Sequence, residues 1–282
     1  MKAIRNIPVK SSMHKKPIVT DIFFIKNNVR KPLIIFCHGY KGYKDWGAWN
    51  LVARFFAKKG LFFVKFNFSH NGGTLENPID FPDLEAFGQN NYIRELDDLD
   101  DIIKRITTHE EYASEIDRGD ITLIGHSRGG GIACLKAAEN KLVKRVISWA
   151  GTSDFEARMP SGKELSDWEK AGVAYVMNAR TNQNMPLYYQ FYQSFKDNIE
   201  RLTVKNAVEK LKIPQLIIQG EGDVVVQPDE ARNLHKWNPK SKLVLIEDMN
   251  HTLGSAQPWE KSTMPTHLKS VVDETIRFIN TN

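Results

Sequence analysis

The sequence of 282 residues predicts an α/β protein with a mostly parallel central sheet, helices on both faces and a helical lid insertion. Three observations support this prediction. Short β-branched, apolar runs alternate with longer runs of helical periodicity, which is typical of a parallel sheet with crossover helices. Several of the short runs are almost continuously apolar, as strands covered on both faces are. One long segment, residues 155–212, interrupts the alternation.

Seven runs have the length and composition of strands, and the first two shape one edge of the expected sheet. They follow each other too closely for a crossover helix, so we expect an antiparallel edge near the N-terminus. The predicted strands are Ile18–Ile25, Leu33–Cys37, Leu61–Phe68, Ile121–Gly125, Val143–Trp149, Pro214–Gln219 and Leu243–Ile246.

Five segments between or after these strands have helical patterns. In the second of them, apolar residues recur at helical spacing and carboxylates occupy the opposite face. The predicted helices are Trp49–Lys59, Tyr92–Thr107, the segment from Ser127 to Asn140, Asp229–Trp237 and His267–Ile279.

The segment between Asp154 and Ile213 contains helical and aromatic sequence, and we expect no strand in it. An insertion this long within a compact α/β domain usually serves function, often as a lid over the site. We therefore predict a single domain, 1–282, with a helical lid or cap at 155–212. Its aromatic residues, among them Trp168 and Tyr175, either line a substrate pocket or pack the insertion onto the domain.

Composition excludes several classes of protein. Lys and Arg number 39 against 34 Asp and Glu, a modest net charge of +5, and no motif of a nucleic-acid-binding protein occurs. No apolar stretch is long enough to span a membrane. Cys37 and Cys134 fall in predicted buried elements and are expected to be free thiols, so the cytoplasm is the expected compartment. Because no metal-ligand spacing or cofactor motif occurs, we expect neither metal nor cofactor.

The stretch Gly125-His126-Ser127-Arg128-Gly129 places a serine between a predicted strand and a predicted helix. Strand, G-x-S-x-G and helix form the nucleophile elbow, which exposes the serine hydroxyl above the sheet. The helix N-terminus behind it offers free N–H groups to a developing oxyanion. The alternatives are a serine that merely caps the helix and a phosphate-binding loop, although the G-x-x-x-x-G-K-[ST] pattern is absent.

A nucleophilic serine needs a base, an acid that orients the base, and oxyanion donors. Asp223 follows the predicted strand that ends at Gln219, and His251 lies in the turn after the last predicted strand. The carboxyl ends of parallel strands meet at one edge of the sheet, so we expect Ser127, Asp223 and His251 to converge there. The glycine-bearing loop 38–42 follows another strand end and can direct an N–H toward the serine.

Other acids and histidines remain as alternatives or supports. Asp154 also follows a strand and competes with Asp223 for the acid's position, whereas Glu221 and Asp248 fit the turns less well. His126 is expected to be buried and structural, and His38 to brace the oxyanion loop. His70 is a candidate for the pocket. The remaining histidines show no pairing pattern and are expected at the surface: His14, His109, His235 and His267.

With HGYKG, GHSRGG, GEGD and MNHT as matching motifs, the chain resembles the α/β-hydrolase superfamily from about Ile18 to Ile279. It looks most like the carboxylesterase branch with cinnamoyl (feruloyl) esterases and dienelactone-hydrolase-like proteins. Such esterases often read F-D-F and G-H-G after the oxyanion loop. This chain has Phe66-Asn67-Phe68 and Ser69-His70-Asn71-Gly72, so the likeness leaves the substrate open.

The resemblance implies a serine carboxylesterase acting through an acyl-enzyme. Ser127 attacks the acyl carbonyl, His251 transfers the proton, and Asp223 orients His251. The backbone N–H groups of Tyr40 and Arg128 form the oxyanion hole. Apart from the resemblance, the positive side chain of Arg128 or of Lys41 can attract a carboxylate.

The expected partner is a small-molecule ester, with no nucleic acid and no membrane, and the oligomeric state is open. The alternatives are a peptidase or thioesterase on the same fold, and a hydrolase-fold binding protein with an idle triad.

Overall fold

A computed structural model describes residues 1–282. The central strands are β1 (Lys2–Val9), β2 (Ile18–Phe24), β3 (Lys31–Cys37), β4 (Phe62–Phe66), β5 (Ile116–His126), β6 (Val143–Trp149), β9 (Gln215–Gly220) and β10 (Lys242–Ile246). They form one eight-stranded sheet in the order β1-β2-β4-β3-β5-β6-β9-β10. β2 pairs antiparallel with both β1 and β4, and all other neighbours are parallel.

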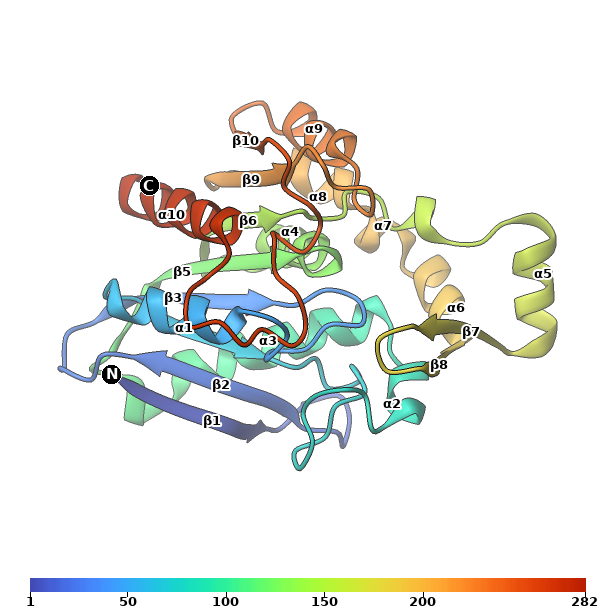
Figure 1. The fold of residues 1–282 in the computed structure, drawn as a ribbon, viewed down its shortest axis with the longest axis horizontal. Coiled ribbons are helices and arrows are strands. Elements are labelled where there is room, and N and C mark those ends of the chain that lie inside the picture. The colour runs from blue at the N-terminus through green and yellow to red at the C-terminus, as the bar shows by residue number, and fades with distance from the viewer.

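Helices cover both faces of this sheet (Figure 1). The longer ones are α1 (Trp49–Lys58), α3 (Tyr92–Thr108), α4 (Arg128–Glu139), α9 (Pro228–Trp237) and α10 (Thr266–Thr281). α1 and α10 share one apolar cluster with one face of the sheet. α3, α4, α9 and the short α8 (Val204–Glu209) share another cluster with the opposite face. The sheet is therefore the middle of three layers.

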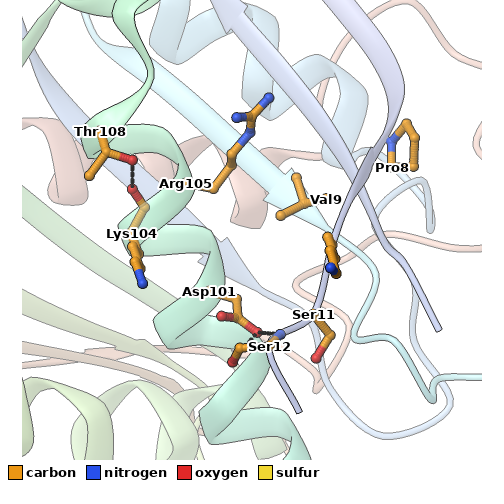
Figure 2. Close-up of a pocket in the computed structure, with 9 residues that line it drawn as sticks. Pro8, Val9, Ser11, Ser12, Asp101, Lys104, Arg105 and Thr108 are labelled. Carbon is orange, nitrogen blue, oxygen red and sulfur yellow. Dashed lines mark hydrogen bonds between the residues drawn. The ribbon is translucent and has the colours of Figure 1, made fainter. Parts of the chain in front are cut away.

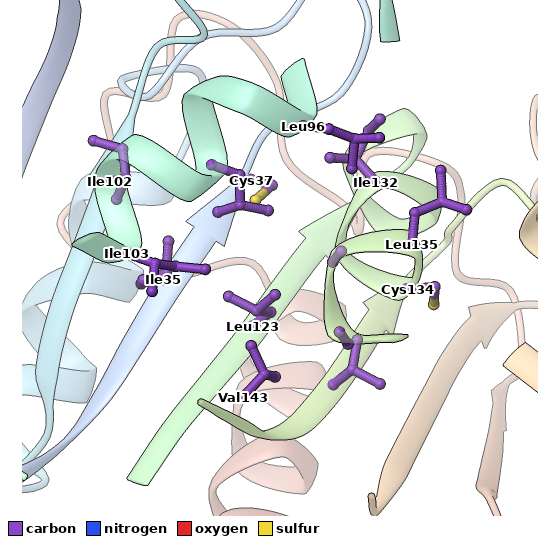
Figure 3. Close-up of a cluster of buried hydrophobic side chains, with 14 of the residues drawn as sticks. Ile35, Cys37, Leu96, Ile102, Ile103, Leu123, Ile132, Cys134, Leu135 and Val143 are labelled. Atoms are coloured by element: carbon purple, nitrogen blue, oxygen red, sulfur yellow. The ribbon is translucent and has the colours of Figure 1, made fainter. Parts of the chain in front are cut away.

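Successive residues along a strand belong in turn to the two apolar clusters. In β3, Leu33 and Ile35 belong to the cluster under α3 and α4, whereas Ile34 and Phe36 belong to the cluster under α1 and α10. Figure 3 shows the first cluster, where side chains of α3 and α4 meet those of β3 and β5. Successive strand residues point to opposite faces, so a strand buried on both sides reads as a continuous apolar run.

The predicted fold class is confirmed. Each predicted strand and helix is present with end shifts of a few residues, and the antiparallel edge forms as expected. The sequence interpretation missed β1, an edge strand with an irregular register near Asn6, whose φ is 53°. Cys37 and Cys134 are buried free thiols, as predicted.

The expectation of a purely helical insertion is wrong. Residues 155–212 contain the antiparallel hairpin β7 (Val173–Asn178) and β8 (Gln183–Tyr188) between short helices. Those helices are α5 (Gly162–Ala171), α6 (Gln190–Asp197), α7 (Ile199–Leu202) and α8, with the 3₁₀ turn η2 (Glu156–Arg158) before them. Figure 1 shows α5, the hairpin and α6 gathered beyond the ends of the central strands. β8 packs on α2 (Leu84–Gly88), where a Cβ at Gly88 would meet Tyr188 at 2.7 Å.

The chain after β1 crosses α3 and is fastened there. Figure 2 shows the Ser12 N–H donating to Asp101 of α3, at 2.7 Å. A cavity of about 510 Å³ lies between this segment and α3, near the 3₁₀ turn η1 (Glu110–Tyr112). Its lining is polar and includes no residue of the predicted site.

Candidate active site

Ser127 lies at the corner between β5 and α4. Its φ of 57° and ψ of −125° are unusual for a residue with a side chain, and such conformations concentrate at functional positions. Its N–H donates to the Trp149 carbonyl of β6 at 3.0 Å, which fixes the corner to the sheet. The local geometry is that of the predicted nucleophile elbow.

The two flanking glycines permit this corner. A Cβ at Gly125 would lie 2.0 Å from the Gly129 carbonyl oxygen, and one at Gly129 would lie 2.4 Å from the Cys37 carbonyl oxygen. No side chain fits either gap. β5, α4 and β3 approach each other closely here because both positions are glycine.

Asp223, His251 and Ser127 form one hydrogen-bonded row. His251 Nδ1 lies 2.8 Å from Asp223 Oδ2, and His251 Nε2 lies 3.0 Å from Ser127 Oγ. In neutral imidazole, Nδ1–H donates to the carboxylate, which leaves Nε2 to accept the serine proton. The structure thus brings together the three side chains that the sequence selects.

Asp223 is held by several donors. The N–H groups of Val225 and Val226 donate to Oδ1 at 2.8 and 2.9 Å, and Gln219 Nε2 donates to Oδ2 at 3.1 Å. Burial raises the pKa of the Asp223 carboxyl, but hydrogen bonds from His251 and these N–H groups outweigh it, so the pKa lies below its ordinary value. The carboxylate therefore stays ionised near neutral pH.

The alternative acids are placed elsewhere. Asp154 is exposed and accepts hydrogen bonds from the N–H groups of Glu156 and Ala157. Glu221 and Asp248 are exposed as well. Only Asp223 contacts His251.

The loop after β3 lies against the serine. A Cβ at Gly39 would be 2.8 Å from Ser127 Cβ and 3.2 Å from Ser127 Oγ. The next N–H, that of Tyr40, donates to no protein group, and the N–H of Arg128 begins α4 and has no acceptor within the helix. The N–H groups of Tyr40 and Arg128 therefore have no protein acceptor, one on the loop against Ser127 and the other at the start of α4.

His38 braces this loop. Its Nδ1–H donates to the Gly39 carbonyl at 2.9 Å, and its Nε2 accepts from the Phe68 N–H at 3.3 Å. Burial lowers the pKa of His38 to about 4, so the ring is neutral at pH 7. The predicted bracing function matches these contacts.

Two cavities open onto Ser127 and His251. The larger has a volume of about 490 Å³ and is lined by Ser127, His251, core side chains and residues of the insertion. The smaller, of about 280 Å³, lies on the side of the oxyanion loop and is lined by Trp46, Trp49, Asn178 and Arg180 among others. Ser127 and His251 therefore lie between two cavities.

Of the four predicted pocket residues, two line a cavity beside Ser127 and two do not. Trp168 and Lys41 line the larger cavity, and Lys41 also lines the smaller one. Tyr175 does not line either; it is 63% exposed on β7. His70 is also outside both, because it is buried beside Arg94 Nη1 at 3.1 Å and Ser69 Oγ at 2.8 Å. The predictions for Tyr175 and His70 need correction.

Another histidine was misplaced by the sequence interpretation. His14, expected at the surface, has only 11% of its side chain exposed. Its Nε2 lies 3.1 Å from Asp98 Oδ1 and 3.0 Å from Ser69 Oγ, and its ring meets that of His70 edge-on at 4.6 Å. The segment after β1 returns across α3 and carries His14 inward.

His126 supports the base from behind. Its Nε2–H donates to the backbone carbonyl of His251 at 2.8 Å, and its ring packs on Trp49 at 5.5 Å. Burial, and after it the charge of the nearby His251, lowers the pKa of His126 to about 3. The residue is buried and structural, as predicted, but its contact with His251 was not foreseen.

The buried, neutral rings of His38 and His126 should make the folded protein less stable in acid. The folded-state pKa values of His38 and His126 lie below the ordinary value near 6.5. Just below pH 6.5, the unfolded chain therefore binds protons at these two rings and the folded protein does not. The free energy of unfolding should therefore decrease as the pH falls below about 6.5, by up to about 1.4 kcal/mol per pH unit for each ring. The free energy of unfolding can be measured with urea at several pH values between 7 and 5. It should change less steeply with pH for His126→Gln than for the wild type. Equal slopes would exclude this contribution of His126.

The structure shows no group of three or more His, Cys, Asp or Glu side chains that could hold a metal ion. None of its helices combines the length and the apolar character that crossing a bilayer requires.

The chain is similar in sequence to known proteins. The family described as "Alpha/beta hydrolase family" matches residues 34–261. Among curated proteins, the monoacylglycerol lipase ABHD6 of Bos taurus is 23% identical over 265 residues, which cover 81% of this chain and 72% of the relative.

Solved structures share the fold. Est1E from Butyrivibrio proteoclasticus, which has also been solved with ferulic acid bound, superposes with a TM-score of 0.69 at 16% identity, covering 100% of this chain and 98% of that one. A putative dienelactone hydrolase from Klebsiella pneumoniae superposes with a TM-score of 0.63 at 15% identity, covering 100% and 99%.

Proposed function

Because the chain belongs to the alpha/beta hydrolase family, we propose that it is a serine hydrolase that cleaves a carboxylic ester through an acyl-enzyme. The observation that carries this proposal is the hydrogen-bonded row of Ser127, His251 and Asp223. His251 Nε2 lies 3.0 Å from Ser127 Oγ, and His251 Nδ1 lies 2.8 Å from Asp223 Oδ2. A poor nucleophile, a base and an ionised acid stand within hydrogen-bond reach of one another, beside two free amides.

Acylation begins when Ser127 Oγ attacks the ester carbonyl carbon and its proton passes to His251 Nε2. The carbonyl oxygen becomes an oxyanion and accepts hydrogen bonds from the N–H groups of Tyr40 and Arg128. His251 then protonates the leaving alkoxide, the C–O bond breaks, and the alcohol departs. Asp223 stabilises the positively charged imidazolium throughout, without taking its proton.

Deacylation repeats these steps with water. His251 takes a proton from a water molecule, the hydroxide adds to the acyl carbon, and the Ser127–acyl bond breaks as the proton returns to Ser127 Oγ. The products are the free serine and a carboxylic acid. No redox partner or metal takes part.

The insertion is proposed to cap the acyl or alcohol half of the substrate. Trp168, Val176, Leu187 and Phe191 line the larger cavity from α5, β7, β8 and α6. The Trp168 Nε1–H donates to the Leu187 carbonyl at 2.8 Å, which fixes the indole against the hairpin. A wall of this kind favours an apolar substrate, which agrees with relatives named monoacylglycerol lipase.

Hydrolysis of a panel of matched substrates tests the proposal. We expect 4-nitrophenyl esters of short and medium acids to be cleaved with a burst of nitrophenol equal to the enzyme concentration when deacylation is slow. Matched thioesters and anilides should be cleaved more slowly. Faster anilide cleavage would favour a peptidase, and no cleavage of any substrate would favour a binding protein with an idle triad.

The oxyanion loop gives a second test. In Gly39→Ala, the new methyl would press on Ser127 Cβ at 2.8 Å and displace the loop that carries the Tyr40 N–H. Loss of one oxyanion donor typically lowers kcat by about 10²- to 10³-fold, and we expect a loss of that order. The control is Gly119→Ala, where a Cβ would touch only Asp117 Oδ1 at 3.4 Å. An unchanged kcat in Gly39→Ala would remove this loop from the mechanism.

A further inference from the structure

The side chain of Arg128 lies in the larger cavity beside the nucleophile. Only 13% of it is exposed, and it lines the same cavity as Ser127 and His251. Its one hydrogen bond runs from Nη1 to Glu95 Oε1, at 3.3 Å. Nε and Nη2 donate to no protein group and are not among the fully enclosed unpaired atoms, so each keeps some accessible surface. Two parallel donors are therefore available to a ligand.

Three aromatic rings hold this guanidinium in place. Its Cζ lies 4.2 Å from the ring centre of Tyr40, 5.1 Å from that of Tyr92 and 5.3 Å from that of Phe191. Such contacts stabilise a cation and restrict its rotation. A restrained, planar pair of donors matches the two oxygens of a carboxylate.

The charges around the cavity also favour an anion. Its lining contains Arg128, Arg158 and Lys41 and no Asp or Glu. Glu95 lies behind Arg128 and outside the lining, and it offsets part of the positive charge there. Burial raises the pKa of the Glu95 carboxyl. The Tyr40 hydroxyl is buried without a partner and offers a further hydrogen-bonding group near the cation.

We propose that the Arg128 side chain binds a free carboxylate of the substrate, so that the enzyme prefers esters that also carry an acid group. This inference rests on the proposed ester hydrolysis and specifies its substrate class. Much of the remaining lining is apolar, and it includes Phe155, Met159, Trp168, Val176 and Leu187. The substrate half in this cavity is therefore an apolar body that carries a carboxylate within reach of Arg128.

Two matched ester pairs test the carboxylate and locate it. Monomethyl adipate and methyl hexanoate differ only by a carboxylate in place of a methyl group on the acyl half. The acetate ester of 6-hydroxyhexanoate and hexyl acetate differ in the same way on the alcohol half. For each pair, the measured quantity is the ratio of kcat/KM for the anionic ester to kcat/KM for the neutral one.

In Arg128→Met, we expect this ratio to fall about 10- to 100-fold for one of the two pairs, as the loss of a hydrogen bond between charged groups implies. Arg128→Gln keeps a donor toward Glu95 without the charge, and it should show the same fall if the methionine variant folds poorly. Glu95→Gln is the matched control. It breaks the same ion pair but keeps the cation, so the ratio should stay or rise.

The outcomes separate the two proposals. If wild type cleaves the neutral esters and Arg128→Met or Arg128→Gln leaves both ratios unchanged, the carboxylate site is wrong and ester hydrolysis stands. A fall in Glu95→Gln equal to that in Arg128→Met would also contradict the site, because it would indicate general disruption of the cavity. If wild type cleaves 4-nitrophenyl esters but none of the four esters, the carboxylate site is wrong. If it cleaves neither set, ester hydrolysis itself is contradicted.

Discussion

Ser127→Ala is expected to lower kcat for ester hydrolysis by about 10⁶-fold, the loss typical when a catalytic serine is removed. The hydroxyl is the only group in the row that can form the acyl bond, and its Oγ makes one hydrogen bond, to His251 Nε2 at 3.0 Å. Steady-state hydrolysis of 4-nitrophenyl esters, with purified variant at high concentration, measures the residual rate.

The same variant should remain folded. Ser127 holds the corner through its backbone, whose carbonyl accepts from Gly130 at 2.9 Å and Thr152 at 3.1 Å, and alanine keeps both contacts. Thermal unfolding should therefore occur within a few degrees of the wild-type midpoint. Wild-type turnover in a folded Ser127→Ala protein would contradict the mechanism, because a group other than Ser127 would then have to be the nucleophile.

Asp223→Asn is expected to lower kcat by about 10⁴-fold, with a smaller effect on KM. An amide can donate to His251 Nδ1 and so favour the tautomer whose Nε2 carries a proton and cannot accept one from Ser127. In the productive tautomer, Nδ1–H donates to the Asp223 carboxylate across the present contact of 2.8 Å. Steady-state kinetics on a single ester measure both parameters.

Asp154→Asn is the matched control for the acid. Asp154 also follows a strand but is exposed and contacts only the N–H groups of its own turn. Its kcat should be within about twofold of wild type, as expected for a surface substitution. A large loss in Asp154→Asn together with a small loss in Asp223→Asn would reverse the assignment.

The candidate site was predictable because its residues follow strands. Ser127, Asp223 and His251 follow β5, β9 and β10, respectively. The carboxyl ends of parallel strands lie at one edge of the sheet, so these residues come together there. The flanking Gly125 and Gly129 mark the sharp corner, and no other residue fits the measured gaps. These features depend on local sequence and strand order alone.

The hairpin in the insertion was less predictable. Val173–Asn178 is half exposed and too short for a clear alternation, and β8 contains Pro186, which argues against a strand. The pairing becomes favourable because Tyr188 packs on Gly88 of α2 and Trp168 bonds to Leu187. These contacts join segments far apart in the sequence, so periodicity cannot show them.

The supporting residues were hidden for the same reason. His126 contacts the backbone of His251, which is 125 positions away, and Arg128 meets Glu95 across 33 positions. His14 reaches Asp98 only because the segment after β1 crosses α3. The sequence names such residues but carries no local signal of which partner each will find.

Covalent labelling with a fluorophosphonate tests the central claim most directly, because the reagent needs an activated serine beside an oxyanion hole. The account predicts one adduct per chain on the peptide that contains Ser127, and a strong reduction of labelling in Asp223→Asn. Absence of an adduct on the folded wild-type protein, or an adduct on a different serine, would contradict it.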